Sequence, residues 1–307
     1  MSISEKEWFI EAPWGRLCVV AWGDCMNPPV LLVHGSRDTA ATFRPLVAML
    51  PDKFYYIAIE LPGNGRSDSY PPGMMISVYD LVYVVTLVVR HFRWDRFTFV
   101  GHSLGTLIGK LYDLSYRGSI AKVVELDPVT KHITVPPSKF AEWYHRSFTA
   151  FYEQYDKLNS PKEKAPSYTR RQAIDSIKEN RGLTEQTAAD TVDRMTEPAG
   201  RGRVRFTSDR RYKYIAAVPF SPEHLKRVFT SITTPTLSIM AENSIKKGLY
   251  RNAEFLLDEG SFKANNYRVR RVEGGHDVHF VNPERVAGFV TQFLLYGLEG
   301  VESKAKL

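Results

Sequence analysis

The sequence predicts an α/β fold, in which a mainly parallel sheet is covered by helices on both faces. Two observations lead to this prediction. Short apolar runs, typical of buried strands, alternate with runs of helical length as far as residue 126. The alternation then stops for about 100 residues and returns as two more strand-like runs and a final helix. We therefore expect one sheet with a helical lid inserted late in the strand order.

The expected elements follow one another with short connections. Some runs have the character of strands, and others have the length and pattern of helices that pack on a sheet. The strands are expected at 7–14, 15–22, 29–35, 54–60, 96–101, 120–126, 235–240 and 267–272, and the helices at 43–50, 77–92, 104–116 and 283–295. The expected division is a core made of residues 1–129 and 231–307 and a lid made of residues 130–230.

The composition limits the class of protein. Of the 307 residues, 43% are hydrophobic, which is enough for one sizeable core with an insertion. Cys18 and Cys25 cannot make a disulfide framework, and no group of Cys and His has metal-site spacing, so we expect no metal or other cofactor. The net charge of +7 is modest, and no nucleic-acid-binding motif is present. The most apolar helix candidate, 81–89, is too short to span a bilayer, so stable membrane insertion is not expected.

The junction between the run at 96–100 and the next helix carries the most informative motif. Gly101-His102-Ser103-Leu104-Gly105 is a G-x-S-x-G pattern between a strand and a helix, which is the context that a nucleophile elbow needs. The sharp turn strains the serine backbone, and side chains at the two glycine positions would clash with neighbouring chain. We therefore predict Ser103 as a nucleophile and Gly101 and Gly105 as the elbow glycines.

A serine hydroxyl needs a base to remove its proton, and imidazole is the usual base at neutral pH. His276 follows the last strand-like run, at the carboxyl edge of the sheet where ligands bind in open parallel sheets. Serine before histidine, with the histidine near the C-terminus, is the chain order of the α/β-hydrolase triad. We predict His276 as the base, with His279 as a weaker rival.

The acid that orients the imidazole has two candidates. The commonest slot follows the strand at 235–240, but Ala241 and Ser244 stand there in the places of the usual glycine and aspartate, and Glu242 is the acid on offer. The other slot follows the strand at 120–126, where Asp127 stands. We favour Asp127 and keep Glu242 as the rival.

Two backbone N–H groups are expected to stabilise the developing oxyanion. One is the N–H of Leu104, directly after the nucleophile, and the other is the N–H of Ser36, which follows His34-Gly35. His34 itself is expected to hold this loop.

The last three residues, Ala305-Lys306-Leu307, resemble the S-K-L address of peroxisomal proteins, which a receptor reads at the end of a chain. The sequence therefore predicts a peroxisomal location with an import receptor as partner, and a cytoplasmic location otherwise.

Several segments are similar to those of one known family. They are Pro13-Trp14-Gly15, Ala21-Trp22-Gly23, residues 28–35, residues 54–58 and Gly101-His102-Ser103. With these segments the chain resembles the serine hydrolase-like protein family of α/β-hydrolases, which contains the insect kraken-type proteins. The resemblance implies the α/β-hydrolase fold, a serine nucleophile and, for some members, a peroxisomal location. It does not name a substrate.

The function expected from these residues is hydrolysis of a carboxylic ester or thioester with an apolar acyl group. Ser103 would attack the carbonyl, His276 would transfer the proton, Asp127 would orient His276, and water would release the acyl-enzyme. The alternative is a ligand-binding protein on a hydrolase scaffold, with slow or absent turnover. A further hypothesis is that four arginines bind an anionic substrate; they are Arg203, Arg205, Arg210 and Arg211.

Overall fold

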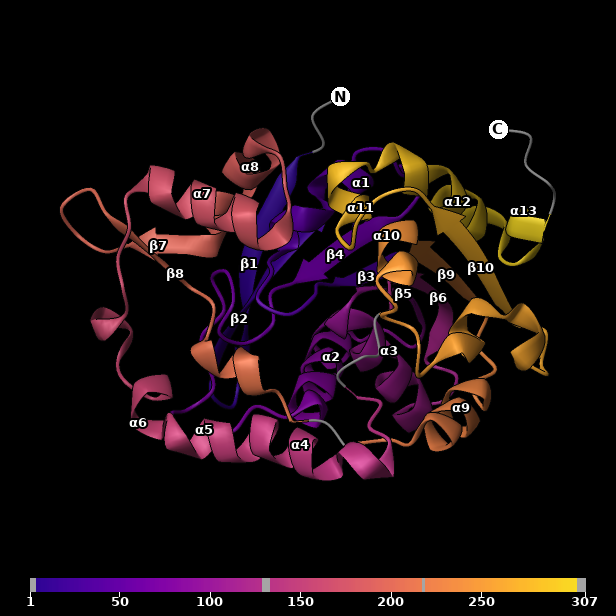
Figure 1. Ribbon diagram of the computed structural model, residues 1–307. Helices are drawn as coiled ribbons and strands as arrows, with labels where there is room; N and C mark the ends of the chain where they lie inside the picture. Colours follow the sequence, from indigo (N-terminus) through magenta and orange to yellow (C-terminus); the bar gives the residue numbers. More distant parts are fainter. Residues whose placement is uncertain (1–3, 129–132, 217–218, 303–307) are drawn as a thin grey trace.

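A computed structural model of the chain describes residues 4–128, 133–216 and 219–302, and its centre is an eight-stranded sheet (Figure 1). The strands lie in the order β1-β2-β4-β3-β5-β6-β9-β10. Their bounds are β1 Glu5–Ala12, β2 Gly15–Trp22, β3 Pro29–Val33, β4 Tyr55–Ile59, β5 Phe97–His102, β6 Ile120–Leu126, β9 Thr236–Ala241 and β10 Tyr267–Val272.

The sheet is mainly parallel, as the sequence predicts. The pairs β1–β2 and β2–β4 are antiparallel, and the pairs from β4 through β3, β5, β6 and β9 to β10 are parallel. The carboxyl ends of six neighbouring strands therefore lie at the same edge of the sheet. The predicted α/β-hydrolase fold is confirmed.

Helices cover both faces of the sheet, because the side chains of each central strand alternate between two apolar layers. In β3, Leu31 and Val33 pack in one layer while Val30 and Leu32 pack in the other. The first layer is completed by α2 Val78–Phe92, α3 Leu104–Ser115 and α9 Pro222–Thr230. The second is completed by α1 Arg44–Val47, α11 Val278–Val281, α12 Glu284–Tyr296 and α13 Glu299–Glu302.

The helix expected at 43–50 is shorter than predicted. The segment opens as a 3-10 turn at Ala40–Phe43, and α1 spans only four residues, with Pro45 in its first turn. The N–H groups of Met49 and Leu50 bond to carbonyls three residues earlier, so the end of the segment is also wound tightly. Apolar spacing does not distinguish these short turns from a regular helix.

An insert lies between β6 and β9, and we define it as the described residues 133–216 and 219–235. Its principal elements are α4 Phe140–Tyr144, the π-helical turn His145–Thr149, α5 Ala150–Glu153, α6 Tyr155–Leu158, α7 Arg170–Arg181, α8 Glu185–Met195, β7 Thr196–Pro198, β8 Val204–Phe206 and α9. In Figure 1 the helices α4 to α6 run along the bottom of the molecule, and α7 and α8 lie beside β1. The antiparallel β7–β8 pair was not predicted from the sequence.

No helix in the described parts of the chain combines the length and the apolar content needed to cross a membrane.

Candidate active site

Ser103 occupies a strained turn between β5 and α3. Its φ is 51° and its ψ is −115°, a conformation that L-residues rarely adopt. The turn fits only because two neighbours are glycine. A Cβ on Gly101 would lie 2.7 Å from the carbonyl of Gly105, and a Cβ on Gly105 would lie 2.1 Å from the carbonyl oxygen of Val33. Any side chain at either position would therefore clash with the backbone.

His276 lies in the turn between β10 and α11, and its ring faces a buried carboxylate. Nδ1 of His276 is 2.6 Å from Oδ2 of Asp127, which is fully buried directly after β6. Asp127 has a positive φ of 47°, so the backbone turns sharply at the end of the strand. The structure therefore brings together two of the predicted site residues that lie 149 positions apart.

Three further donors hold the Asp127 carboxylate in place. Oδ1 accepts a hydrogen bond from the N–H of Ala241 at 2.9 Å and another from the hydroxyl of Tyr250 at 2.7 Å. Oδ2 accepts from the hydroxyl of Ser244 at 2.5 Å. Burial and the charge of Asp127 raise the pKa of Tyr250, so this hydroxyl remains a donor. The carboxylate cannot rotate without losing several of these bonds.

The rival acid points elsewhere. Glu242 is the first residue of α10 Glu242–Lys246, and its side chain is 40% exposed. It forms an i,i+4 ion pair with Lys246 at 3.3 Å. Of the two candidates, Asp127 is the one that contacts His276.

Burial and Asp127 act on the pKa of His276 in opposite directions. Burial favours the neutral imidazole and lowers the pKa, but the hydrogen bond and the charge of Asp127 raise it by more, and the charge of Asp277 raises it further. The pKa of His276 therefore lies above its ordinary value of 6.5.

The predicted oxyanion donors lie on two segments that approach Ser103. Leu104 is the first residue of α3, so its N–H has no acceptor inside the helix. Ser36 follows Gly35, where an added Cβ would be 3.1 Å from the Cβ of Ser103. His34 holds this loop, since its Nδ1 bonds the Gly35 carbonyl at 2.7 Å and its Nε2 accepts from the N–H of Leu61 at 3.0 Å.

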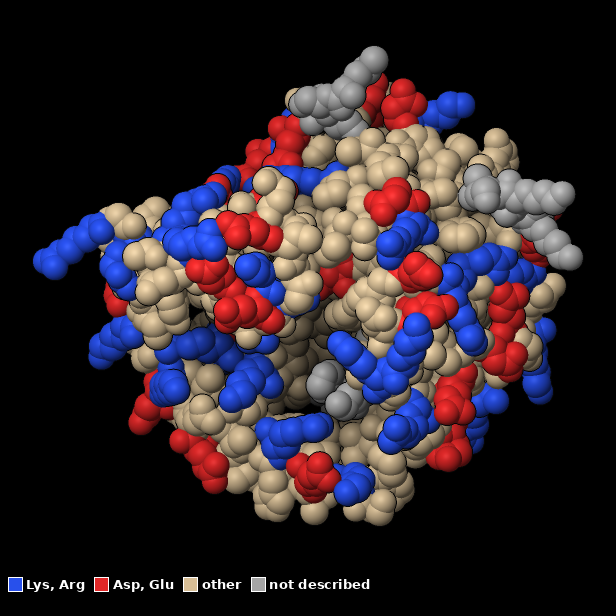
Figure 2. Space-filling view, turned by 45° about the horizontal axis from the view of Figure 1, so that its top comes forward, with Lys and Arg blue, Asp and Glu red and all other residues tan. Residues whose placement is uncertain are grey.

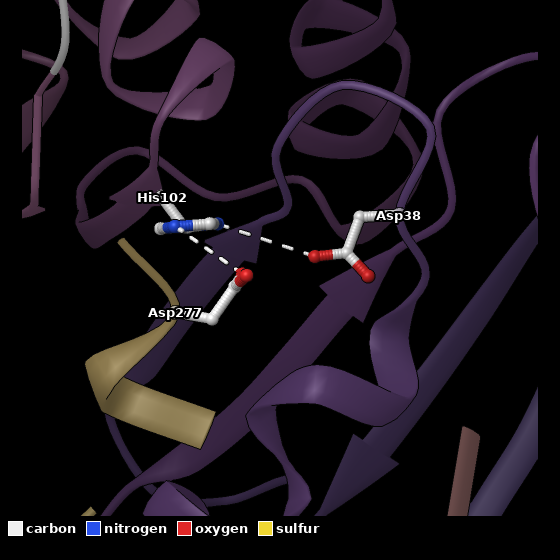
Figure 3. Close-up of side chains that lie close together, drawn as sticks. All are labelled: Asp38, His102 and Asp277. Atoms are coloured by element: carbon white, nitrogen blue, oxygen red, sulfur yellow. Dashed lines mark ion pairs between the residues drawn. The ribbon is translucent and has the colours of Figure 1, made fainter. Parts of the chain in front are cut away.

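Beside the nucleophile, the ring of His102 lies between two carboxylates (Figure 3). Its Nδ1 is 4.0 Å from Asp38 and its Nε2 is 3.9 Å from Asp277. Nε2–H donates to the carbonyl of His276 at 3.0 Å, so His102 supports the turn that carries the predicted base. Burial is the main cause that lowers the pKa of His102, to about 4, and the ring is neutral at pH 7.

Asp38, His102 and Asp277 have the residue types of a metal site, but an arginine already binds both carboxylates. Arg181, from the insert helix α7, donates to both oxygens of Asp38 at 2.9 and 3.1 Å and to both oxygens of Asp277. The guanidinium occupies both carboxylates that a cation would need as ligands, so this group does not fit a metal ion.

Ser103, His276 and Ser36 line one cavity, with a volume of about 1090 Å³. Its walls come from the carboxyl edge of the sheet and from the insert. Apolar insert side chains form part of the wall; they are Leu158, Tyr168, Ile177, Met195 and Phe206. The predicted nucleophile and base thus face a space that can hold a small molecule with an apolar part.

Comparisons with known proteins agree with this geometry. A family model described as alpha/beta hydrolase fold matches residues 28–283. The serine hydrolase-like protein of Danio rerio is 30% identical over 303 residues, which cover 96% of this chain and 90% of that protein. The chain belongs to the serine hydrolase-like family of α/β-hydrolases. The family resemblance stated from the sequence is confirmed.

Solved structures of other α/β-hydrolases share its fold. The hypothetical protein PA1622 from Pseudomonas aeruginosa superimposes with a TM-score of 0.80 at 20% identity, over 94% of this chain and 99% of that one. The thioesterase domain from the curacin biosynthetic pathway gives a TM-score of 0.73 at 17% identity, over 94% and 99% of the two chains.

Sequence reasoning missed several residues at the site of this α/β-hydrolase. Arg181 and Asp38 lie 143 positions apart, and Tyr250 and Asp127 lie 123 apart, so no local spacing signals their contacts. One signal was available. Asp277 directly follows the predicted base and projects a charge at the carboxyl edge of the sheet.

The four arginines suggested as an anion site have separate partners in the structure. Arg211 is buried, pairs with Asp209 at 2.7 Å and donates to the carbonyls of three residues of the 70–74 loop. Arg203 bonds Ser167, Arg205 lies 3.8 Å from Glu197, and Arg210 bonds Ser160. Of the four, Arg210 and Arg211 line the cavity that contains Ser103, whereas Arg203 and Arg205 do not. Anion binding by these arginines stays a hypothesis. The predicted address Ala305-Lys306-Leu307 lies outside the described residues.

Proposed function

We propose that this protein is a serine hydrolase that cleaves a carboxylic ester or thioester through an acyl-enzyme, with Ser103, His276 and Asp127 as the triad. Membership of the family supports hydrolase activity. The observation that carries the finer proposal is the 2.6 Å contact between His276 Nδ1 and Asp127, beside a strained serine in the same cavity.

The roles follow from the hydrogen-bonding atoms. Asp127 accepts a hydrogen bond from the Nδ1–H of His276. Nε2 is then the unprotonated nitrogen, and it takes the proton of Ser103. The Ser103 oxygen then attacks the carbonyl carbon, and the charge that develops on the carbonyl oxygen is met by the N–H groups of Leu104 and Ser36. The protonated His276 gives its proton to the departing alcohol or thiol, and an attacking water repeats these steps to release the acid.

The alternative, a binding protein with slow or absent turnover, rested on Ser244 in the place of the usual acid. Asp127 reaches His276 from the neighbouring strand, so this reason no longer applies. The thioesterase domain from the curacin biosynthetic pathway shows that this fold can carry thioester cleavage. At 17% identity the likeness is one of fold.

Covalent labelling with a fluorophosphonate probe tests the nucleophile. We expect rapid labelling of the wild type and none of Ser103→Ala, because only an activated serine reacts quickly. Ser208→Ala is a matched control, since Ser208 also lines the cavity and its labelling is expected to equal the wild type. Folded wild-type protein that does not react, or Ser103→Ala that reacts normally, would refute the proposed mechanism.

We also propose a peroxisomal location, supported by Ala305-Lys306-Leu307 alone. A fluorescent protein fused to the N-terminus should enter peroxisomes with the full chain and remain in the cytoplasm when these three residues are deleted.

A further inference from the structure

The cavity beside Ser103 is lined by more positive than negative side chains. Its lining contains eight Lys and Arg residues and three Asp residues among the described chain. The three acids are already engaged, because Asp38 and Asp277 bind Arg181 and Asp209 binds Arg211. In Figure 2 the surface is hollowed near its centre, and blue Lys and Arg side chains border the hollow.

Six of these eight basic side chains have no ion pair with any carboxylate of the described residues. One of the six, Arg210, is half-buried and bonds Ser160. The other five are exposed, and we call these five the basic rim. They are Arg37, Lys157, Lys162, Lys213 and Lys247. All five are exposed at the cavity. Their charges are therefore available to a ligand.

The basic rim converges on the cavity from separate parts of the chain. Arg37 directly follows Ser36 on the loop after β3 and has a positive φ of 55°. Lys157 lies on α6 and Lys162 begins the next 3-10 turn, while Lys213 lies in the 3-10 turn Arg210–Tyr214 and Lys247 follows α10. Charges on the solvated face of one helix would all lie on the same element. These five residues lie on separate elements, and what they have in common is that they line the cavity.

We infer that the substrate carries an anionic group, a carboxylate or a phosphate, which the basic rim binds while the apolar part packs against the insert. The inference rests on the proposed ester or thioester hydrolysis and adds the charge class of the substrate. Like charges around a partly enclosed cavity raise the local concentration of an oppositely charged ligand. An exposed pair of unit charges about 4 Å apart in water is worth about fivefold in affinity, and screening by salt reduces this to about threefold.

The test compares pairs of substrates that differ by one anionic group. One pair is the butyryl thioesters of pantetheine and of 4′-phosphopantetheine, which places a phosphate on the leaving group. The other pair is 4-nitrophenyl pentanoate and mono-4-nitrophenyl glutarate, which places a carboxylate on the acyl chain. We expect a lower KM for the anionic member of at least one pair and little change in kcat, because the rim contributes binding away from the reacting atoms.

The variant that removes three rim charges is Lys157→Gln/Lys162→Gln/Lys213→Gln. It should raise the KM of the preferred anionic substrate by about thirtyfold, the product of about threefold for each charge, and leave the neutral substrate unchanged. The matched control is Lys6→Gln/Lys53→Gln/Lys263→Gln, which removes the same charge near the starts of β1, β4 and β10, at the opposite edge of the sheet. The control should change both KM values by less than about twofold.

Binding to the Ser103→Ala protein separates this inference from the proposed function. Calorimetric titration with the two anionic substrates should show, for at least one of them, binding that weakens as NaCl is raised and that the triple rim substitution weakens by about thirtyfold. Such binding without turnover in the wild type would refute the hydrolase proposal and leave the anionic site standing. If both anionic substrates bind no more tightly than their neutral partners, or if the rim and control variants behave alike, the inference is overturned.

Discussion

Replacing Asp127 with asparagine is expected to reverse the hydrogen bond to His276. The backbone N–H of Ala241 cannot turn, so the amide oxygen of the new side chain must face it in the place of Oδ1. The amide NH2 then takes the place of Oδ2 and points at His276 Nδ1. A donor there forces the tautomer that carries its proton on Nε2, which cannot accept a proton from Ser103.

The expected loss in kcat follows from this change of tautomer. A wrong tautomer in a serine–histidine pair lowers kcat by about 10⁴, which corresponds to about 5.5 kcal/mol. The fold should survive, because Ser244 can rotate its hydroxyl to accept from the new NH2 and the Tyr250 hydroxyl still has the amide oxygen as an acceptor. We therefore expect a folded protein with almost no activity.

The assay is the rate of fluorophosphonate labelling together with hydrolysis of a short 4-nitrophenyl ester, with circular dichroism to verify folding. Glu242→Gln is the matched control, since it removes one carboxylate next to the same site, and its exposed ion pair with Lys246 is worth less than about 1 kcal/mol. Its rate should stay within about threefold of the wild type. A folded Asp127→Asn protein with more than about a tenth of the wild-type rate would refute the assignment of the acid.

Three further outcomes are expected. Gly105→Ala should lower the free energy of unfolding in urea by about 3 kcal/mol, because its Cβ would meet backbone, whereas Gly275→Ala, which meets nothing within 4 Å, should change it by less than about 1 kcal/mol. Activity should fall with decreasing pH through an apparent pKa above 6.5 in a kcat/KM profile, because His276 must be neutral to act as a base and its pKa is raised; a limb centred below 6.5 would contradict this. Arg181→Met should cost about 3–5 kcal/mol of unfolding free energy by leaving two buried carboxylates unpaired. The loss should shrink at acidic pH, because burial raises the pKa of Asp277 but the charge of Arg181 outweighs it and lowers the pKa, and this stabilisation is lost once Asp277 is protonated; an unchanged urea midpoint at pH 7 would contradict this.

The sheet and the elbow were predictable because their signals are local. A buried parallel strand must be a short apolar run, and β3, β4, β5, β6, β9 and β10 all begin and end within about two residues of the expected runs. The elbow needs glycine at two fixed spacings from Ser103, so the motif alone is enough to predict the turn.

The contacts between the insert and the core were not predictable, because each joins a charge on one element to a charge far along the chain. Arg194 of α8 is buried and binds Glu60, 134 positions away, and Glu7 on β1. Arg181 binds Asp38 and Asp277 in the same manner. An arginine in a polar helix has the same appearance in sequence whether it faces water or a buried carboxylate.

The position of the acid shows why two sequence slots competed. β6 and β9 are parallel neighbours, and the N–H of Asp127 bonds to the carbonyl of Ile239 on β9 at 2.8 Å. Residues that follow either strand therefore reach the same point at the carboxyl edge, which is why the Ser244 hydroxyl, from the other slot, lies 2.5 Å from Asp127. A serine in that slot supplies a donor where a second carboxylate would add a like charge. The absence of aspartate after β9 is thus evidence for the acid after β6, and the two slots have to be considered together.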